Sequence, residues 1–162
     1  MAETCTGLDW TLAEAPTRER LVAKLMSSPD ACVKKVLTAK EVTRLQEADQ
    51  VVPAVYLVYM GFGVASADGE GALRVTYRHK WIVSVAVQSA AAQTDPQLLH
   101  AAAAPIAARV AAALHGWAPA KGWAAFEPVT PPPVAYSDLG YCYVPQAFVS
   151  TTVGRSIVGR PG

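Results

Sequence analysis

Three histidines and a cysteine are the residues of this chain whose types come nearest to supporting chemistry. His79, His100 and His115 do not form an HExxH or any other metal-ligand spacing, so we expect one packed imidazole and two surface imidazoles. Cys142 can in principle join a histidine and Asp138 in a Cys/His hydrolase, because catalytic triads converge in space and not in sequence. No local motif supports such a triad. We therefore expect no catalytic residue, no metal site and no enzymatic activity.

One glycine-rich segment, Gly61–Ser66, resembles the start of a dinucleotide-binding fingerprint. That fingerprint needs three glycines and a strand followed by a helix, because the helix N-terminus binds the pyrophosphate. Here the third glycine is absent and a hairpin signal follows. We therefore expect these glycines to lie within a strand and the chain to bind no cofactor.

The cysteines and the N-terminus bear on the compartment of the protein. Cys5, Cys32 and Cys142 are odd in number and lack CxxC spacing, which fits reduced, structural thiols in a cytosolic protein. Residues 1–10 carry two acidic residues in place of a basic region, and no stretch approaches the roughly 18 apolar residues that span a bilayer. We expect neither an export signal nor a membrane span.

Length and composition predict one domain with a surface that meets partners. A chain of 162 residues can bury one core without disulfides or metals. Its residues are 52% hydrophobic and only 17% charged, which is low for a soluble monomer. The formal net charge is +1 and the charges are scattered, so a phosphate-binding footprint is absent.

The first third of the chain predicts short elements. Residues 1–16 show no clear period and are expected to form an N-terminal arm. Thr17–Met26 has apolar residues at helical spacing and predicts a short amphipathic helix. Ala31–Thr38 predicts a short strand, and the charged run Lys40–Asp49 is either helical or a loop.

The centre of the chain carries the strongest strand signals. Val51–Val64 alternates two apolar faces and predicts a covered strand, and Ala67–Gly71 is the clearest hairpin turn. Leu73–Gln88 alternates one apolar and one polar face, so we expect one face to pack on the core. The apolar face comprises Val75, Tyr77, His79, Trp81, Val83, Val85 and Val87, and the polar face comprises Arg74, Arg78, Lys80, Ser84 and Gln88.

A second helix follows the hairpin. Asp95 and the proline after it form an N-terminal signal, the alanine-rich stretch continues to Leu114, and Gly116 is placed as a C-cap. Pro105 interrupts this stretch, so we expect either a kink or two helices, the second opening at the proline.

The remaining segments complete the expected fold. Trp117–Ser137 has no period and predicts a connecting loop, Tyr141–Thr152 predicts the last strand, and residues 154–162 predict a flexible tail. The order of elements predicts a single α+β domain of two layers over residues 17–153. Its sheet should be mostly antiparallel with helices packed on one face.

Tryptophans and cations supply the candidate contact residues. Trp81 lies on the apolar strand face and is expected in the core, whereas Trp117 and Trp123 lie in a loop with few packing companions and are interface candidates. The alternating cations of the Leu73–Gln88 strand form either a solvated face or partners for acidic groups of a neighbouring subunit.

Three segments in this order resemble a known family. They are the strand Tyr77–Val87, the helix end Ala113–Pro119 and the strand Tyr143–Thr151. Their order and the chain length are similar to the tail-terminator or tail-completion proteins of long-tailed phages, in the Mu-like and lambda U-like groups. The resemblance covers Thr17–Val153.

The resemblance implies a structural role. Its members form a hexameric ring on the head-proximal end of the tail tube, stop tube polymerisation and offer a surface for head-completion or connector proteins. The implied partners are further copies of the chain, the tail tube protein and the head-completion protein, with no membrane. Genome DNA would pass through the lumen without specific binding. The implied place is the virion tail, after assembly in the host cytoplasm.

A ring of this kind needs two different complementary patches on each subunit, because cyclic contacts are heterologous. The interface candidates are Asp68, Gly69, Glu70 and Gly71 of the hairpin, Arg74 and Arg78 of the strand, and Trp117 and Trp123 of the loop. Another neck or head-completion protein would share this size and class. A small ligand-binding or enzymatic domain would need convergent polar groups in a pocket, and no spacing in the chain predicts one.

Overall fold

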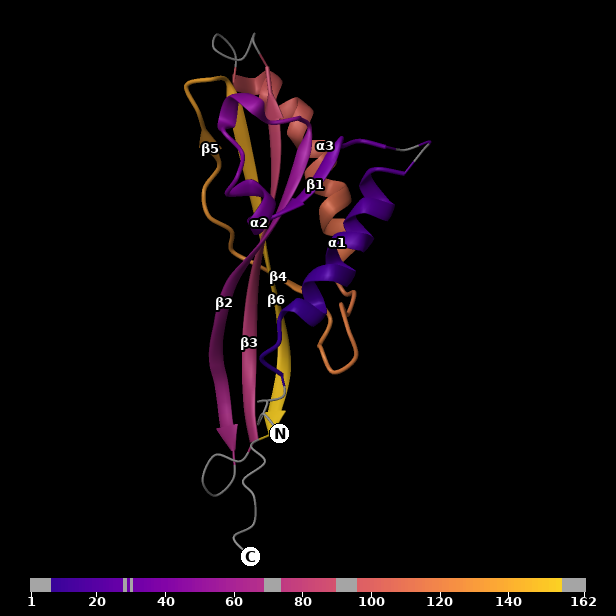
Figure 1. Cartoon of the computed structure of the whole chain (residues 1–162), viewed down its shortest axis with the longest axis vertical. Coiled ribbons are helices and arrows are strands. Elements are labelled where there is room, and N and C mark those ends of the chain that lie inside the picture. Colours follow the sequence, from indigo (N-terminus) through magenta and orange to yellow (C-terminus); the bar gives the residue numbers. More distant parts are fainter. Residues whose placement is uncertain (1–6, 28, 30, 69–73, 90–95, 156–162) are drawn as a thin grey trace, which may run out of the picture.

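A computed structural model describes residues 7–27, 29, 31–68, 74–89 and 96–155 and contains a mixed six-stranded sheet with three α-helices (Figure 1). The strand order is β1-β2-β3-β6-β4, and β5 also pairs with β6. The strands are β1 (Lys35–Thr38), β2 (Ala54–Asp68), β3 (Arg74–Gln88), β4 (Glu127–Val129), β5 (Ala135–Tyr136) and β6 (Tyr141–Arg155). The helices are α1 (Thr11–Leu25), α2 (Ala39–Val42) and α3 (Pro96–Leu114), with a 3-10 turn, η1, at Glu47–Asp49. The predicted α+β class is confirmed.

Three antiparallel strands of 15 residues each, β2, β3 and β6, form the centre of the sheet. The hairpin reversal is confirmed, because Asp68 pairs with Arg74. The turn residues Gly69, Glu70 and Gly71 lie outside the described residues. The sheet is mixed because the short β1 pairs with β2 in parallel, at Ala54–Leu57.

The predicted alternation of β3 between a core-facing and a polar side is confirmed over residues 77–81. Tyr77, His79 and Trp81 are buried, whereas Arg78 and Lys80 between them are exposed. We name the side that carries His79 and Trp81 the helix face, and the opposite side the groove face. Over residues 77–81 the two faces therefore differ in chemistry as well as in burial, whereas Ile82 and Ala86 further along the groove face are apolar and buried.

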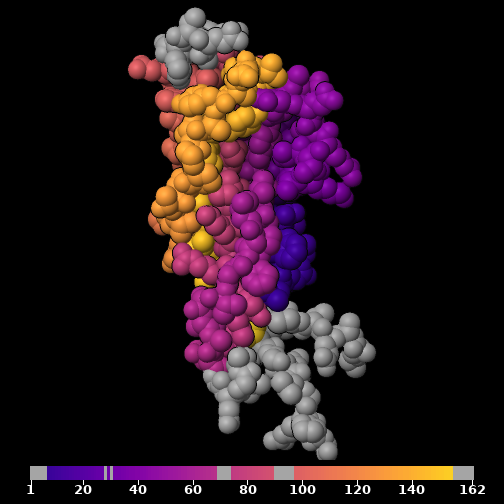
Figure 2. All heavy atoms as spheres, turned by 90° about the vertical axis from the view of Figure 1, so that its left-hand side faces the viewer, coloured from indigo at the N-terminus to yellow at the C-terminus, as the bar shows by residue number. Residues whose placement is uncertain are grey.

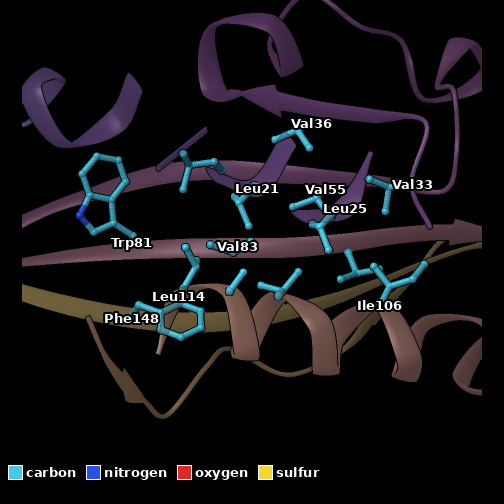
Figure 3. Packing of buried hydrophobic residues seen from close by; sticks show 14 of the residues in the cluster. Leu21, Leu25, Val33, Val36, Val55, Trp81, Val83, Ile106, Leu114 and Phe148 are labelled. Atoms are coloured by element: carbon cyan, nitrogen blue, oxygen red, sulfur yellow. The ribbon is translucent and has the colours of Figure 1, made fainter. Parts of the chain in front are cut away.

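Both long helices pack on the helix face and close the main core (Figure 3). Leu21 and Leu25 of α1 and Leu114 of α3 meet Trp81 of β3 and Phe148 of β6 in one buried cluster. The same cluster includes Val33, Val36, Val55, Val83 and Ile106. Trp81 is fully buried, as expected from its strand position.

The first helix begins at Thr11, six residues before the predicted start at Thr17. Asp9 explains the earlier start, because its Oδ1 accepts hydrogen bonds from the Thr11 amide at 3.1 Å and the Thr11 hydroxyl at 2.5 Å. Buried Ala13 extends the core stripe of the helix in the same direction. The division into an arm over 1–16, a domain over 17–153 and a tail over 154–162 stays a prediction.

The charged run Lys40–Asp49 contains both α2 and η1, and it lies on the groove face near β1. Val42 of α2 packs against a small second cluster made by Ala54, Tyr56 and Ala86. The two long helices thus share one face, as expected, while this short helix covers part of the other.

The helix before Gly116 is one continuous element, so the alternative of two helices divided at Pro105 is wrong. Pro105 is exposed on it, and Gly116 ends it with a φ of +77°. The expectation that no stretch is apolar enough to span a bilayer also needs correction, since Gln97–Leu114 reaches a mean hydropathy of 1.3 over 18 residues. This segment supplies Leu99, Ile106 and other buried residues to the core, which explains its apolar character.

The predicted loop Trp117–Ser137 contains two short strands, β4 and β5, which both pair with β6. Pairing with β6 gives backbone groups of this segment partners that a free loop would lack. Phe126 of the same segment is buried between Trp117 and Phe148. The apolar residues of the segment, which showed no period, therefore serve the core.

The three long strands continue beyond the helices (Figure 1). Because β1 pairs with only the first four residues of β2, the outer edge of residues 58–68 has no strand beside it among the described residues. We name this part of the sheet, with the facing residues of β3 and β6, the distal sheet.

Candidate functional site

His79 is the one histidine of the three that is packed, as expected, with 0% of its surface exposed. Its Nδ1 lies 2.7 Å from the Tyr59 hydroxyl, and its Nε2 lies 3.0 Å from the Gly7 carbonyl oxygen and 2.9 Å from Thr152 Oγ1. Burial lowers the pKa of His79, and the hydrogen bond to Gly7 opposes this in part. These contacts join β3 to three other parts of the chain, at Gly7, Tyr59 and Thr152, which is a structural role.

Cys142 is also buried, and burial raises the pKa of its thiol. A nucleophilic cysteine needs a lowered thiol pKa, so this environment opposes the hydrolase alternative. Among the described residues, no group of three histidine, cysteine, aspartate or glutamate side chains is placed to hold a metal. His100 is exposed and forms a hydrogen bond with the Tyr136 hydroxyl.

The glycine-rich segment lies inside β2, as expected, and creates an irregularity there. The register with β3 shifts between Tyr59 and Gly61, and Gly61 adopts a φ of +102°. Tyr59 pairs with Trp81 and, because of the shift, Phe62 pairs with His79. Phe62 therefore lies on the helix face, whereas simple alternation placed it with Met60 on the other side.

The groove face of the distal sheet is hollowed between β2 and the segment that contains β4, and the hollow has a volume of about 570 Å³. Two cations, Arg78 and Lys80, line it together with the glycines of β2 and apolar side chains from β4 and β6. Both cations are exposed, and neither makes a hydrogen bond or ion pair with a described residue. We name this surface the cationic groove and define it by Met60, Gly61, Gly63, Arg78, Lys80, Val129 and Val149. Phe62 and Val64 also border the hollow, but their cross-strand partners His79 and Tyr77 place their side chains on the helix face.

The helix face of the distal sheet carries exposed apolar side chains beyond the end of α1. Phe62 is 49% exposed and Val64 is 62% exposed. Trp10 stacks on Tyr59 with ring centroids 4.8 Å apart and remains partly exposed, as does Leu12 in the first turn of α1. We name this surface the acidic–apolar patch and define it by Asp9, Trp10, Leu12, Phe62 and Val64.

Two of the predicted interface residues lie at the end of the distal sheet. Asp68 and Arg74 are paired across β2 and β3 and are exposed. Arg78 lies further along β3, in the cationic groove. The strand cations therefore point away from the core, as expected, and lie together on one face.

The two loop tryptophans differ from this group. Trp123 is only 7% exposed and packs on His79 with ring centroids 4.4 Å apart, so the premise that it has few packing companions is wrong. Trp117 is half-buried against Phe126, and the Arg20 guanidinium lies 4.9 Å above its ring. Both rings thus have packing partners within the subunit, and their part in an interface stays a prediction.

A chain of polar side chains on the groove face was not predicted. Tyr56 donates a hydrogen bond to Gln50 Oε1, and Gln50 Nε2 donates to the Tyr143 hydroxyl at 2.9 Å. Tyr143 in turn donates to Glu47 Oε1 at 3.2 Å. Burial is the main cause that raises the pKa of Tyr56 to about 12. These contacts fix η1 on the sheet, and no sequence spacing indicated them.

Comparisons with known proteins agree with this architecture. The family described as phage tail terminator protein matches residues 12–157. A solved chain from a structure titled "Virion of native gene transfer agent (GTA) particle" has a similar fold, with a TM-score of 0.54 and 16% sequence identity. The similarity covers 87% of this chain and 94% of the other.

No curated protein sequence matches the chain. The family match extends from the start of α1 to the end of β6 and so includes nearly every element of the fold. The chain therefore belongs to the phage tail terminator family and is a structural protein of the phage tail.

Proposed function

We propose that the protein forms a hexameric ring that caps the head-proximal end of the tail tube, ends tube polymerisation and provides the surface for head–tail joining. The main observation that supports a ring is that the two faces of the distal sheet differ in chemistry. One face bears the cationic groove and the other bears the acidic–apolar patch. A closed ring requires two such different surfaces on each subunit.

Capping follows if only one side of the ring matches the last ring of the tube. The other side then cannot template a further tube subunit, and growth stops there. Asp68 and Arg74 lie at the end of the projecting sheet, where they are exposed and suited to contact the tube protein. The opposite side of the ring would meet the head-completion or connector protein.

The lumen of the proposed ring lets genome DNA pass without specific binding. The formal net charge of +1 and the scattered charges give no strong attraction for a phosphate backbone. The subunits would assemble in the host cytoplasm and remain at the head-proximal end of the tail in the virion.

The first test measures the native mass of the purified protein over a range of concentrations and then mixes it with growing tubes of the cognate tail protein. We expect hexamers, or monomers that become hexamers at tube ends, and tubes of fixed length. Electron microscopy should show the protein at one end of each tube. A monomer at every concentration that leaves tube growth unchanged would refute the proposal. Binding to heads alone would favour a head-completion protein.

A further inference from the structure

The cationic groove and the acidic–apolar patch lie on opposite faces of the same strands. Trp10 stacks on Tyr59, whose cross-strand partner on the helix face is Trp81. Lys80 precedes Trp81 in β3 and therefore points to the groove face. Figure 2 shows α1 in indigo on one side of β2 and the segment that includes β4 in orange on the other. One subunit thus presents the two surfaces in opposite directions.

We infer that the acidic–apolar patch of one subunit packs into the cationic groove of the next, with Asp9 pairing with Arg78 and Lys80 across the contact. This inference rests on the proposed ring and names the surfaces that would build it. Each contact joins two unlike surfaces, so it can repeat from subunit to subunit until the ring closes.

The groove is built to receive a carboxylate beside apolar side chains. Arg78 and Lys80 have no described partner and so keep their donors available. Gly61 and Gly63 flank these cations on β2, and a Cβ placed on either glycine would meet nothing within 4 Å. Val129 and Val149 supply apolar surface to the same hollow. A neighbour can therefore approach the β2 backbone closely while its acid reaches the cations.

The patch supplies the matching groups. The two hydrogen bonds that the Asp9 side chain accepts both end on Oδ1, and among the described residues none ends on Oδ2. Trp10, Leu12, Phe62 and Val64 are exposed apolar side chains of the patch, and Asp9 lines a small hollow together with Leu12, Lys121 and Val153. Exposed apolar side chains gathered beside one charge are typical of a protein interface.

A second copy of the chain fits the groove better than nucleic acid does. Phosphate recognition relies on clustered cations and gains little from Val129, Val149 or Met60. The chain itself carries the acidic and apolar groups that complement the groove, and it carries them on the opposite face. Duplex DNA is therefore the competing occupant that an experiment must exclude.

Charge reversal tests the pairing. We expect the double variant Arg78→Glu with Lys80→Glu, and separately Asp9→Lys, to raise the protein concentration for half-assembly at least about 10-fold. Arg44→Glu is the matched control, because Arg44 is an exposed cation outside both surfaces. Circular dichroism and thermal unfolding check that each variant is folded. Unchanged assembly of the reversed variants would overturn the inference.

Mixing the two defective variants gives a sharper test. In a ring that alternates the Asp9→Lys chain with the Arg78→Glu, Lys80→Glu chain, every contact again joins opposite charges. We therefore expect an equimolar mixture to assemble near the wild-type concentration, while each variant alone does not. A mixture that assembles no better than its components would overturn the pairing even if each single variant is defective.

Cross-linking tests the geometry without changing charge. In a chain with Cys5 replaced by serine, we expect Leu12→Cys protein mixed with Met60→Cys protein to form mixed disulfide dimers. Each variant alone should form few, because a heterologous contact brings unlike surfaces together. Dimers formed mainly by Leu12→Cys protein alone would indicate a symmetric contact and would overturn the inference.

The outcomes separate this inference from the ring proposal. If wild-type rings cap tubes and the charge-reversed variants assemble normally, the inferred contact between patch and groove is refuted, while the proposed capping function is retained. A wild-type protein that neither assembles nor caps would refute both. Duplex DNA binding that is lost on reversal of Arg78 and Lys80, with assembly unchanged, would assign the groove to DNA.

Discussion

Acidification should destabilise this protein through His79, which has no solvent-exposed surface. The Gly7 carbonyl oxygen can only accept, so Nε2 carries the proton of the neutral ring and Nδ1 accepts from the Tyr59 hydroxyl. A second proton would enter on Nδ1, against that hydroxyl, and would place a charge in the core. Burial accordingly lowers the pKa of His79 from its usual 6.5.

The direction and slope of the effect follow from linkage. Below the unfolded-state pKa of 6.5, the unfolded chain binds a proton at His79 that the folded chain refuses. The contribution of His79 is therefore complete above that pH and is lost as the pH falls from 6.5 toward the lower folded pKa. In that window His79 reduces the free energy of unfolding by at most about 1.4 kcal/mol per pH unit.

Urea unfolding from about pH 7.5 to about pH 5.5 measures this slope. We expect His79→Gln to be less stable than wild type at the upper pH, because it disturbs the contacts to Tyr59 and Gly7, and to lose much of the wild-type pH dependence. His115→Gln is the matched control, since His115 is exposed, and should keep that dependence. Parallel pH profiles of wild type and His79→Gln would refute the reasoning.

Three further changes test the core, a turn and the polar chain. Phe148→Ala should lower the free energy of unfolding by about 3–5 kcal/mol, because it empties the centre of the main cluster; calorimetry or urea unfolding measures the loss. Gly140→Ala should lower the free energy of unfolding by at least about 1 kcal/mol in the same assay, because φ is +80° and a Cβ would lie 3.1 Å from the Ser89 carbonyl oxygen. Gly63→Ala is the control and should change the free energy of unfolding by less than about 0.5 kcal/mol, since a Cβ there would meet nothing within 4 Å. Tyr56 should ionise near pH 12 in an absorbance titration, and the stability it contributes should be present below pH 10 and fall as the pH rises toward 12. Gln50→Ala should lower the free energy of unfolding by about 1 kcal/mol, because it removes the hydrogen bonds to Tyr56 and Tyr143; urea unfolding at neutral pH measures the loss.

The long strands and the main core could be predicted because the local pattern of apolar and polar residues indicates which side chains face the core. Trp81 ends a run in which apolar or aromatic residues alternate with Arg78 and Lys80, and both its strand and its burial are confirmed. The alanine-rich helix before Gly116 was predicted for the same reason. Of the two alternatives for Pro105, a kink or a division into two helices, the division is wrong, because a proline on the exposed side of a long helix can be accommodated without ending it.

Trp123 shows why its intramolecular packing could not be predicted from the sequence, while a role of Trp117 and Trp123 in an interface stays a prediction. Their segment has no period, since its residues contact β6 and His79 through single, unrelated contacts. An aperiodic aromatic residue can be buried by distant parts of the chain as readily as by a partner. Only the three-dimensional position of Trp123 against His79 decides between the two. The polar chain through Gln50 was missed for the same physical reason.

The distal sheet contains two register shifts between β2 and β3, and the first of them, between Tyr59 and Gly61, determines the two surfaces. A glycine inside a strand often marks a bulge, and Gly61 does so here. By shifting the register, the bulge places Phe62 opposite His79 on the helix face, beyond the reach of α1, where almost half of its surface stays exposed. The same shift leaves Gly61 and Gly63 beside Lys80 and Arg78 on the other face. One extra residue in β2 thus creates both the apolar surface on one side and the close approach to the cations on the other, so the two surfaces of the proposed ring contact have a common structural origin.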